Sequence, residues 1–252
     1  MNKNYKKGFT LAEALITLGI IGVVAALTLP ALVQKQQEKA TVTALKKFYS
    51  MLSQAYIQAK LENGTVDTWY ETSMTQQERS NLVAEKLIKH IKTTKICKNN
   101  LGECFAERVN SIDGHVSVSW NNTNRYSIFI TADGMSVLVN GYTTPETNDE
   151  IQSIGFTYAD VIVDINGYKR PNTIGKDIFS FLLTKDKVIP SGIQNQSITS
   201  TENETRISFP GDCNTTKCFD ICESCTAWVI YNENMDYLHC DDLSWDGKTS
   251  CK

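Results

Sequence analysis

Residues 1–34 read MNKNYKKGFTLAEALITLGIIGVVAALTLPALVQ, and this stretch decides the architecture of the chain. Three lysines precede Gly8, and residues 9–34 then contain a single charged side chain, Glu13. As a helix, residues 9–33 would span roughly 37 Å, which exceeds the hydrocarbon core of a bilayer at about 30 Å. The segment is therefore able to cross a membrane.

Three kinds of N-terminal segment could explain this pattern. The length of the apolar run and the presence of Glu13 distinguish them. A secretory signal peptide has an apolar run of about 7–15 residues before a small-residue cleavage site. Val24-Ala25-Ala26 is a loose site of that kind, but the apolar run is longer and continues past it. An ordinary membrane anchor fits the length and leaves Glu13 unexplained, because a carboxylate in a membrane helix costs around 2.5–3.5 kcal/mol. No Lys or Arg lies within the run, so its partner must be water at the lipid surface, another chain or a newly made N-terminus.

The third kind of segment is a prepilin signal. Gly8-Phe9-Thr10-Leu11-Ala12-Glu13 closely resembles the processing signal of type IV prepilins and type II secretion pseudopilins. The resemblance implies that a prepilin peptidase cuts between Gly8 and Phe9 and methylates the new amine of Phe9. It also implies that Glu13 meets the N-terminal amine of a neighbouring subunit during filament assembly. Such a pairing is physically reasonable, since a carboxylate and an ammonium buried together offset each other's desolvation cost.

Helical periodicity continues beyond Pro30, a common kink position in this family, to about Glu62. One apolar stripe recurs at spacings of three and four, and it consists of Leu45, Phe48, Leu52, Ala55 and Ala59. Asn63-Gly64 is a helix stop signal. A second helix is expected over about 75–92, starting at the capping box Thr75-x-x-Glu78.

Strand patterns follow the helices. Alternating apolar residues predict strands over 115–120, 125–131, 135–139, 158–165 and 177–183. Asp133-Gly134 predicts a hairpin turn, and a second hairpin is expected from 227–231 and 235–238 around 232–234. The polar stretch 191–208 predicts a surface loop. The expected fold class is α+β and pilin-like: a long N-terminal helix packed on an antiparallel sheet, with a disulfide-stapled C-terminal region.

These patterns divide the chain into four parts. Residues 1–8 are expected to be a cleaved leader, and residues 9–33 a transmembrane and assembly helix. Residues 34–63 would be an amphipathic helix that joins the head, and residues 64–252 an extracytoplasmic globular head.

The cysteines indicate an oxidising compartment. Eight occur among 252 residues, and none precedes Cys97. Disulfides account for them better than zinc does, because residues 213–225 hold only one CxxC, whereas zinc ribbons and fingers present two matched pairs. We expect Cys97 to join Cys104 and leave the other pairings open. The remaining candidates are Cys213, Cys218, Cys222, Cys225, Cys240 and Cys251.

One segment of the head has the composition of a calcium loop. Asp164 and Asn166 alternate ahead of Gly167, and Asn172 and Asp177 follow. Calcium takes six to eight oxygen ligands, and glycine permits the sharp bend around the ion. The segment is not an EF-hand, because it lacks the third acidic position and the closing Glu. The competing interpretation is a turn-rich connection between two strands, since the same residue types make turns.

The whole sequence favours a structural role over catalysis. The formal net charge of −3 argues against nucleic acid as a partner, and no catalytic motif is evident. The resemblance implies a subunit of a type IV pilus or type II secretion pseudopilus, without separating the two. Its expected partners are prepilin peptidase, other pilin or pseudopilin subunits and the assembly machinery of the bacterial inner membrane. The alternative is a membrane-tethered extracytoplasmic binding module that does not polymerise.

Overall fold

The computed structural model describes residues 10–71, 73–112, 116–119, 123–142, 157–167, 169–191, 225–245 and 247–251. The chain divides into two compact units, Met1–Ala40 and Thr41–Lys252. Helix α1 (Leu11–Asn63) contributes to both units and contains Pro30 within its length. Among the described residues it is the one helix long and apolar enough to cross a membrane.

Helix α1 ends at Asn63, as the predicted stop signal Asn63-Gly64 indicates. Gly64 adopts φ +78°, a left-handed conformation that glycine tolerates at a helix C-terminus. Its amide donates to the Lys60 carbonyl at 2.9 Å, and the Asn63 side chain donates to the Ala59 carbonyl at 2.8 Å. These bonds satisfy carbonyls that the last turn leaves without an intrahelical partner.

A short 3-10 helix, η1 (Val66–Thr68), leads to α2 (Gln76–Ile88). The predicted capping box is present, because Thr75 accepts from the Glu78 amide while Glu78 accepts from the Thr75 amide. The start of α2 is therefore confirmed. The helix ends at Ile88, four residues before the predicted limit, and β1 begins at Thr93.

Within the described residues, the head is built on a six-stranded sheet in which every neighbouring pair of strands is antiparallel. The strand order is β1 (Thr93–Lys98), β4 (Tyr126–Thr131), β5 (Ser136–Gly141), β6 (Thr157–Asp164), β7 (Ile178–Thr184) and β8 (Val188–Pro190). A second sheet pairs β2 (Arg108–Asn110) with β3 (Val116–Ser119), and η2 (Thr123–Arg125) precedes β4. Five strands match predicted segments, as does the turn at Asp133-Gly134. Strand β1 and the three-residue strands β2 and β8 were not predicted.

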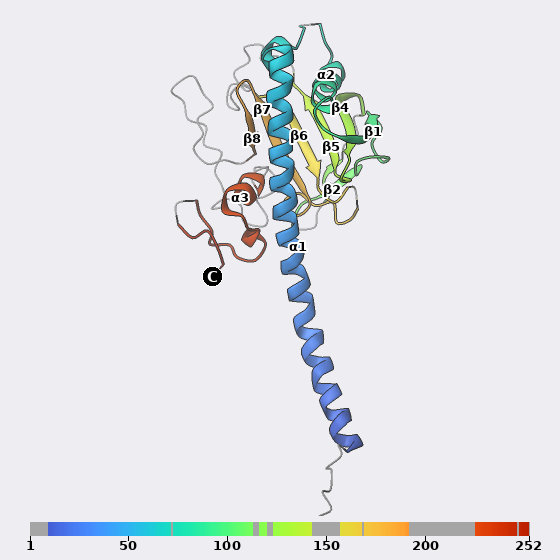
Figure 1. Ribbon diagram of the computed structural model, residues 1–252, viewed down its shortest axis with the longest axis vertical. Coiled ribbons are helices and arrows are strands. Elements are labelled where there is room, and N and C mark those ends of the chain that lie inside the picture. The colour runs from blue at the N-terminus through green and yellow to red at the C-terminus, as the bar shows by residue number, and fades with distance from the viewer. Residues whose placement is uncertain are drawn as a thin grey trace, which may run out of the picture. The chain divides into compact units, whose positions relative to one another are not determined.

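One face of the large sheet carries the main core. The predicted stripe of α1 is buried there: Phe48, Leu52 and Ala59 join Phe129, Val161 and Phe181 in one apolar cluster. Helix α2 packs against β4 and β5 (Figure 1), and the rings of Phe48 and Phe181 lie 5.6 Å apart. The α+β class, with a long helix on an antiparallel sheet, is confirmed.

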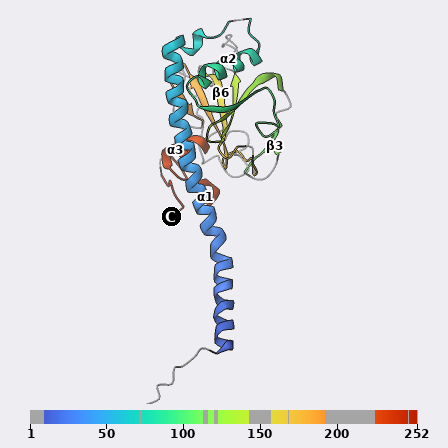
Figure 2. The same ribbon diagram turned by 45° about the vertical axis from the view of Figure 1, so that its right-hand side comes forward.

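The opposite face of the sheet carries a smaller cluster. Ile128, Leu138 and Ile178 alternate with residues of the main core and contact Phe105 and the buried Cys97–Cys104 disulfide. Figure 2 shows β3 on the side of the sheet away from the part of α1 that belongs to the head. The predicted pairing of Cys97 with Cys104 is confirmed, with a Cα–Cα distance of 6.4 Å.

The predicted C-terminal hairpin is wrong. Residues 225–232 form α3 (Cys225–Asn232), and η4 (Asp236–Leu238) follows where a second strand was expected. The apolar run is too short for its periodicity to separate a buried strand from a buried helix. Ala227, Trp228 and Val229 are consecutive buried residues of α3, which packs against β7 and β8.

Replacing Leu52 with alanine should destabilise the head by about 2–5 kcal/mol, because the change leaves a cavity in the core. Leu61→Ala is the matched control: it lies on the same helix and is 75% exposed, so an effect within about 0.5 kcal/mol is expected. Denaturant unfolding of the full chain in detergent micelles, followed by tryptophan fluorescence, measures both. Equal losses in the two variants would contradict this assignment of the core.

Candidate functional site

The start of α1 is closed by a hydrogen-bonded box between Thr10 and Glu13. The Thr10 amide donates to Glu13 Oε2 at 2.8 Å, and the Thr10 hydroxyl donates to the same oxygen at 2.9 Å. In return, the Glu13 amide donates to Thr10 Oγ1 at 3.2 Å. The carboxylate thus binds orphan donors of its own helix N-terminus, where the helix dipole also favours a negative charge.

This box was missed in the sequence, although its signal was visible. Thr10-x-x-Glu13 has the same capping-box spacing as Thr75-x-x-Glu78. From the sequence, the partner of Glu13 was expected to be water, another chain or a new N-terminus. The structure adds a fourth partner, the N-terminal turn of the same chain.

The part of α1 between Leu11 and Val33 exposes a continuous apolar surface. The large exposed side chains there are Leu11, Leu15, Ile16, Leu18, Ile20, Ile21, Val23, Val24, Leu27, Leu29, Leu32 and Val33. The few hydroxyls in this run are satisfied within the helix, since Thr17 donates to the Glu13 carbonyl and Thr28 to the Val24 carbonyl, each at 2.9 Å. A helix with internally satisfied polar groups and an apolar surface suits a bilayer or a bundle of similar helices.

Gly8 and Phe9, the predicted processing residues, lie outside the described residues. Cys213, Cys218 and Cys222 also lie outside them, while Cys225 is buried at the start of α3. Of the other cysteines, Cys240 and Cys251 form a disulfide with a Cα–Cα distance of 5.8 Å.

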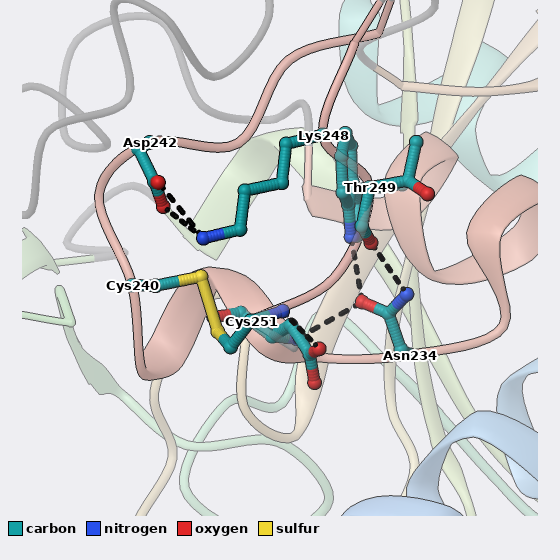
Figure 3. Close-up of a disulfide and its surroundings, with 8 residues drawn as sticks. Asn234, Cys240, Asp242, Lys248, Thr249 and Cys251 are labelled. Carbon is teal, nitrogen blue, oxygen red and sulfur yellow. Dashed lines mark hydrogen bonds and ion pairs between the residues drawn. A yellow bond between two sulfur atoms is a disulfide. The ribbon is translucent and has the colours of Figure 1, made fainter.

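The C-terminal disulfide belongs to a compact polar cluster centred on Asn234 (Figure 3). Asn234 Oδ1 accepts from the Trp228 indole at 2.9 Å and from the Asp236 amide at 3.0 Å. Asn234 Nδ2 donates to the Asn232 and Thr249 carbonyls, both at 3.0 Å. One side chain therefore ties α3, η4 and the segment that carries Cys251.

The structure brings together the four residues predicted to bind calcium. Asp177 Oδ2 accepts from the Asn166 side chain and from the Asn172 amide, both at 2.9 Å, and Asp177 Oδ1 accepts from the Thr173 amide at 2.6 Å. Asp164 Oδ1 accepts from the Asn166 amide at 3.2 Å. Burial and the nearby Asp177 raise the pKa of the Asp164 carboxyl to about 7. Burial also raises the pKa of the Asp177 carboxyl, although its hydrogen bonds oppose the effect.

No group of three or more His, Cys, Asp or Glu side chains among the described residues is arranged to hold a metal ion. Any cation at the loop between β6 and β7 must therefore be held partly by amide and backbone oxygens. Calcium binding by this loop stays a prediction from the sequence.

Comparison with known families agrees with the geometry of the N-terminus. Residues 3–29 match the model described as "Prokaryotic N-terminal methylation motif". Together with the capped, exposed apolar helix, this match defines a type IV pilin-like prepilin signal on a membrane-anchored chain. Pilin-like proteins have structural and not enzymatic roles. The signal also implies that a prepilin peptidase and pilin-type subunits are partners in general.

Residues 31–232 match a second model, described as "Family of unknown function (DUF6613)". Because this match covers most of the chain, the protein belongs to that family. No curated protein and no solved structure matches the chain.

Asn234→Ala should destabilise the C-terminal cluster by about 1–3 kcal/mol, because it leaves the buried Trp228 indole without its acceptor and breaks the bonds to the Asn232 and Thr249 carbonyls. Cleavage by trypsin after Lys248 should accelerate in the same variant. Asp242→Ala, which removes only the exposed ion pair with Lys248, should change global stability far less. Chemical denaturation and timed proteolysis of the full chain in micelles measure both effects. An unchanged Asn234→Ala variant would contradict the central position of this side chain.

Proposed function

We propose that this protein is a filament subunit, cut between Gly8 and Phe9 by a prepilin peptidase and methylated on Phe9. The observation that carries the proposal is the prepilin signal followed at once by a capped helix with an exposed apolar surface. In this proposal residues 9–33 hold the chain in the cytoplasmic membrane and then form the packed core of a pilus or pseudopilus. The two disulfides of the described head fit an extracytoplasmic location.

The energetics of the helix support transfer from membrane to filament. The apolar side chains of residues 11–33 can pack against either lipid or the equivalent helices of other subunits. Moving the helix from one environment to the other therefore exposes none of its apolar surface to water. Glu13 is the exception, because a carboxylate without partners is expensive in either environment. The box with Thr10 supplies partners in the single chain. The hydrogen bonds of the box leave the Glu13 carboxylate negatively charged. In the filament, the positively charged amine of Phe9 of a neighbouring subunit would neutralise it.

Mass spectrometry of the protein from its own host tests the processing step. We expect a chain that starts at Phe9 and carries one added methyl group on its terminal amine. A chain that still carries Met1, or one that starts after Ala26, would contradict prepilin processing. The tethered binding module would then become the better description.

Substitutions at the box separate its capping role from its role in assembly. Glu13→Gln preserves the cap, because glutamine also serves in capping boxes, but it removes the charge. We expect this variant to be inserted and cleaved normally and to be lost from filaments. Thr10→Ala, which loses the hydroxyl and retains the carboxylate, should still assemble. Immunoblots of the membrane and sheared-filament fractions measure insertion, cleavage and assembly together.

Two outcomes would contradict the proposed charge pairing. Normal assembly of Glu13→Gln would show that capping, and not charge, is the function of this residue. Loss of assembly in Thr10→Ala with retention in Glu13→Gln would assign the hydroxyl the decisive role. Crosslinking that captures no like or related subunit in the wild type would contradict filament formation itself.

A further inference from the structure

Lysines recur at every third position between residues 86 and 98, and no acidic residue lies among them. These five lysines give the segment a formal charge of +5 in a chain whose net charge is −3, so the rest of the chain carries −8. The segment contains the end of α2, the connection to β1 and β1 itself. Positive charge is therefore concentrated in one part of an acidic protein.

Most of these lysines are available to a partner. Lys89, Lys92 and Lys98 are exposed, and in the part of the chain that the structure describes their side chains form no ion pair. Lys95 pairs with Glu103, but the two side chains remain 44% and 51% exposed. An ion pair so open to water contributes little and can exchange partners.

Two irregularities of β1 bring Lys95 and Lys98 to the same face of the sheet. In a regular strand, residues three apart point to opposite faces. The register shifts of β1 instead place Lys95 opposite Ile130 and Lys98 opposite Ile128, and these two isoleucines share one face of β4. Together with the two lysines that precede the strand, they form a surface that we call the basic edge: Lys89, Lys92, Lys95 and Lys98.

Exposed apolar side chains lie beside the basic edge. Beyond Val33, the large apolar side chains of the described residues that are more than half exposed are Ile57, Leu61, Ile96 and Tyr231. Ile96 lies within β1, and Ile57 lines a groove together with His90 of the connection between α2 and β1. Leu61 lies one turn beyond Ile57 on the same face of α1. Exposed apolar groups rimmed by polar residues are typical of a protein–protein contact.

Tyr231, the remaining exposed apolar side chain, lies in a part of the head with the opposite charge. Residues 225–252, which we call the acidic end, contain five acidic residues and two lysines, a formal charge of −3. Within the described part of the acidic end, exposed Asp241 forms no ion pair. The ring of Tyr231 lies edge-on to that of Trp245, with centroids 6.2 Å apart, and this contact holds the exposed aromatic side chain in place.

The basic edge and the acidic end lie at opposite edges of the large sheet. Strand β1 begins the strand order and β8 ends it, and α3 of the acidic end packs against β7 and β8. Figure 1 shows α3 and β1 on opposite sides of the head. The two surfaces cannot meet within one chain, but they can meet between two copies. A head-to-tail contact of this kind is heterologous, and it propagates into a ring or an open filament.

We propose that the basic edge of one copy binds the acidic end of a second copy. Tyr231 of the second copy supplies the apolar anchor of the contact, and Ile57, Leu61 and Ile96 supply the apolar surface that receives it. A second copy is the occupant that the charges favour, because the chain outside residues 86–98 is acidic and complements the lysines. The inference rests on the proposed filament function, for which it names a contact between heads.

The test measures association of the full chain in detergent micelles, which cover the apolar helix so that association reports the heads. Sedimentation velocity at an ionic strength of about 0.01 M, where the Debye length is about 30 Å, should show concentration-dependent oligomers. At about 1 M, where the Debye length is about 3 Å, most of this association should be lost. Lys92→Glu and Asp241→Lys should each weaken association at least about fivefold, because each replaces an attraction by a repulsion. The double variant should recover it, since the exchanged charges again meet opposite partners.

Lys187→Glu is the matched control, because it makes the same change of net charge at an exposed position outside both surfaces. This variant should associate as the wild type does. No association of the wild type at low ionic strength, equal losses in Lys187→Glu and Lys92→Glu, or no recovery in the double variant would overturn the proposal. Binding to heparin, used as a polyanion probe, without self-association would also overturn it, in favour of a polyanionic partner.

The contact and the filament function can fail separately. If Lys92→Glu chains that start at Phe9 yield as many filaments as the wild type does, this contact is rejected and the filament proposal stands. If wild-type chains associate in micelles but still carry Met1 in their own host, the filament proposal is rejected and the contact stands.

Discussion

The packing of α1 on the sheet is the contact on which the rest of the head depends. Phe48 and Leu52 are buried in one cluster with Val161 of β6 and Phe181 of β7, and their burial joins the helix to a core shared with α2 and α3. The same helix carries the exposed apolar run between Leu11 and Val33. One continuous element therefore holds both the segment suited to a membrane and the segment that completes the head.

Local signals in the sequence predicted the parts of the fold that depend on a few neighbouring residues. The stop at Gly64, the cap at Thr75 and the turn at Gly134 each follow from backbone preferences that act within four residues. The region of Trp228 was predicted as a strand because its helix is short and almost wholly buried. Its conformation is decided by packing against β7 and β8, which no local pattern reveals.

The same distinction applies to the two candidate sites. Asp164, Asn166, Asn172 and Asp177 are close in sequence, so their convergence could be anticipated from a turn-rich connection. The position of Ser136, which pairs with Asp164 across β5 and β6, could not be anticipated, because it depends on the register of the two strands. At the N-terminus the spacing of Thr10 and Glu13 was sufficient to predict their box. The resemblance placed the partner of Glu13 in another chain, whereas the structure gives it one three residues away, Thr10.

The edges of the large sheet, as far as the structure describes it, have a consequence for the filament proposed above. Edge strand β8 is three residues long and ends in Pro190, which has no amide to donate. The opposite edge strand, β1, has register shifts along its pairing with β4 and carries Lys95 and Lys98. Short, bulged, charged or proline-containing edges resist pairing with another sheet. In the proposed filament, these edges would therefore resist pairing between the sheets of neighbouring heads.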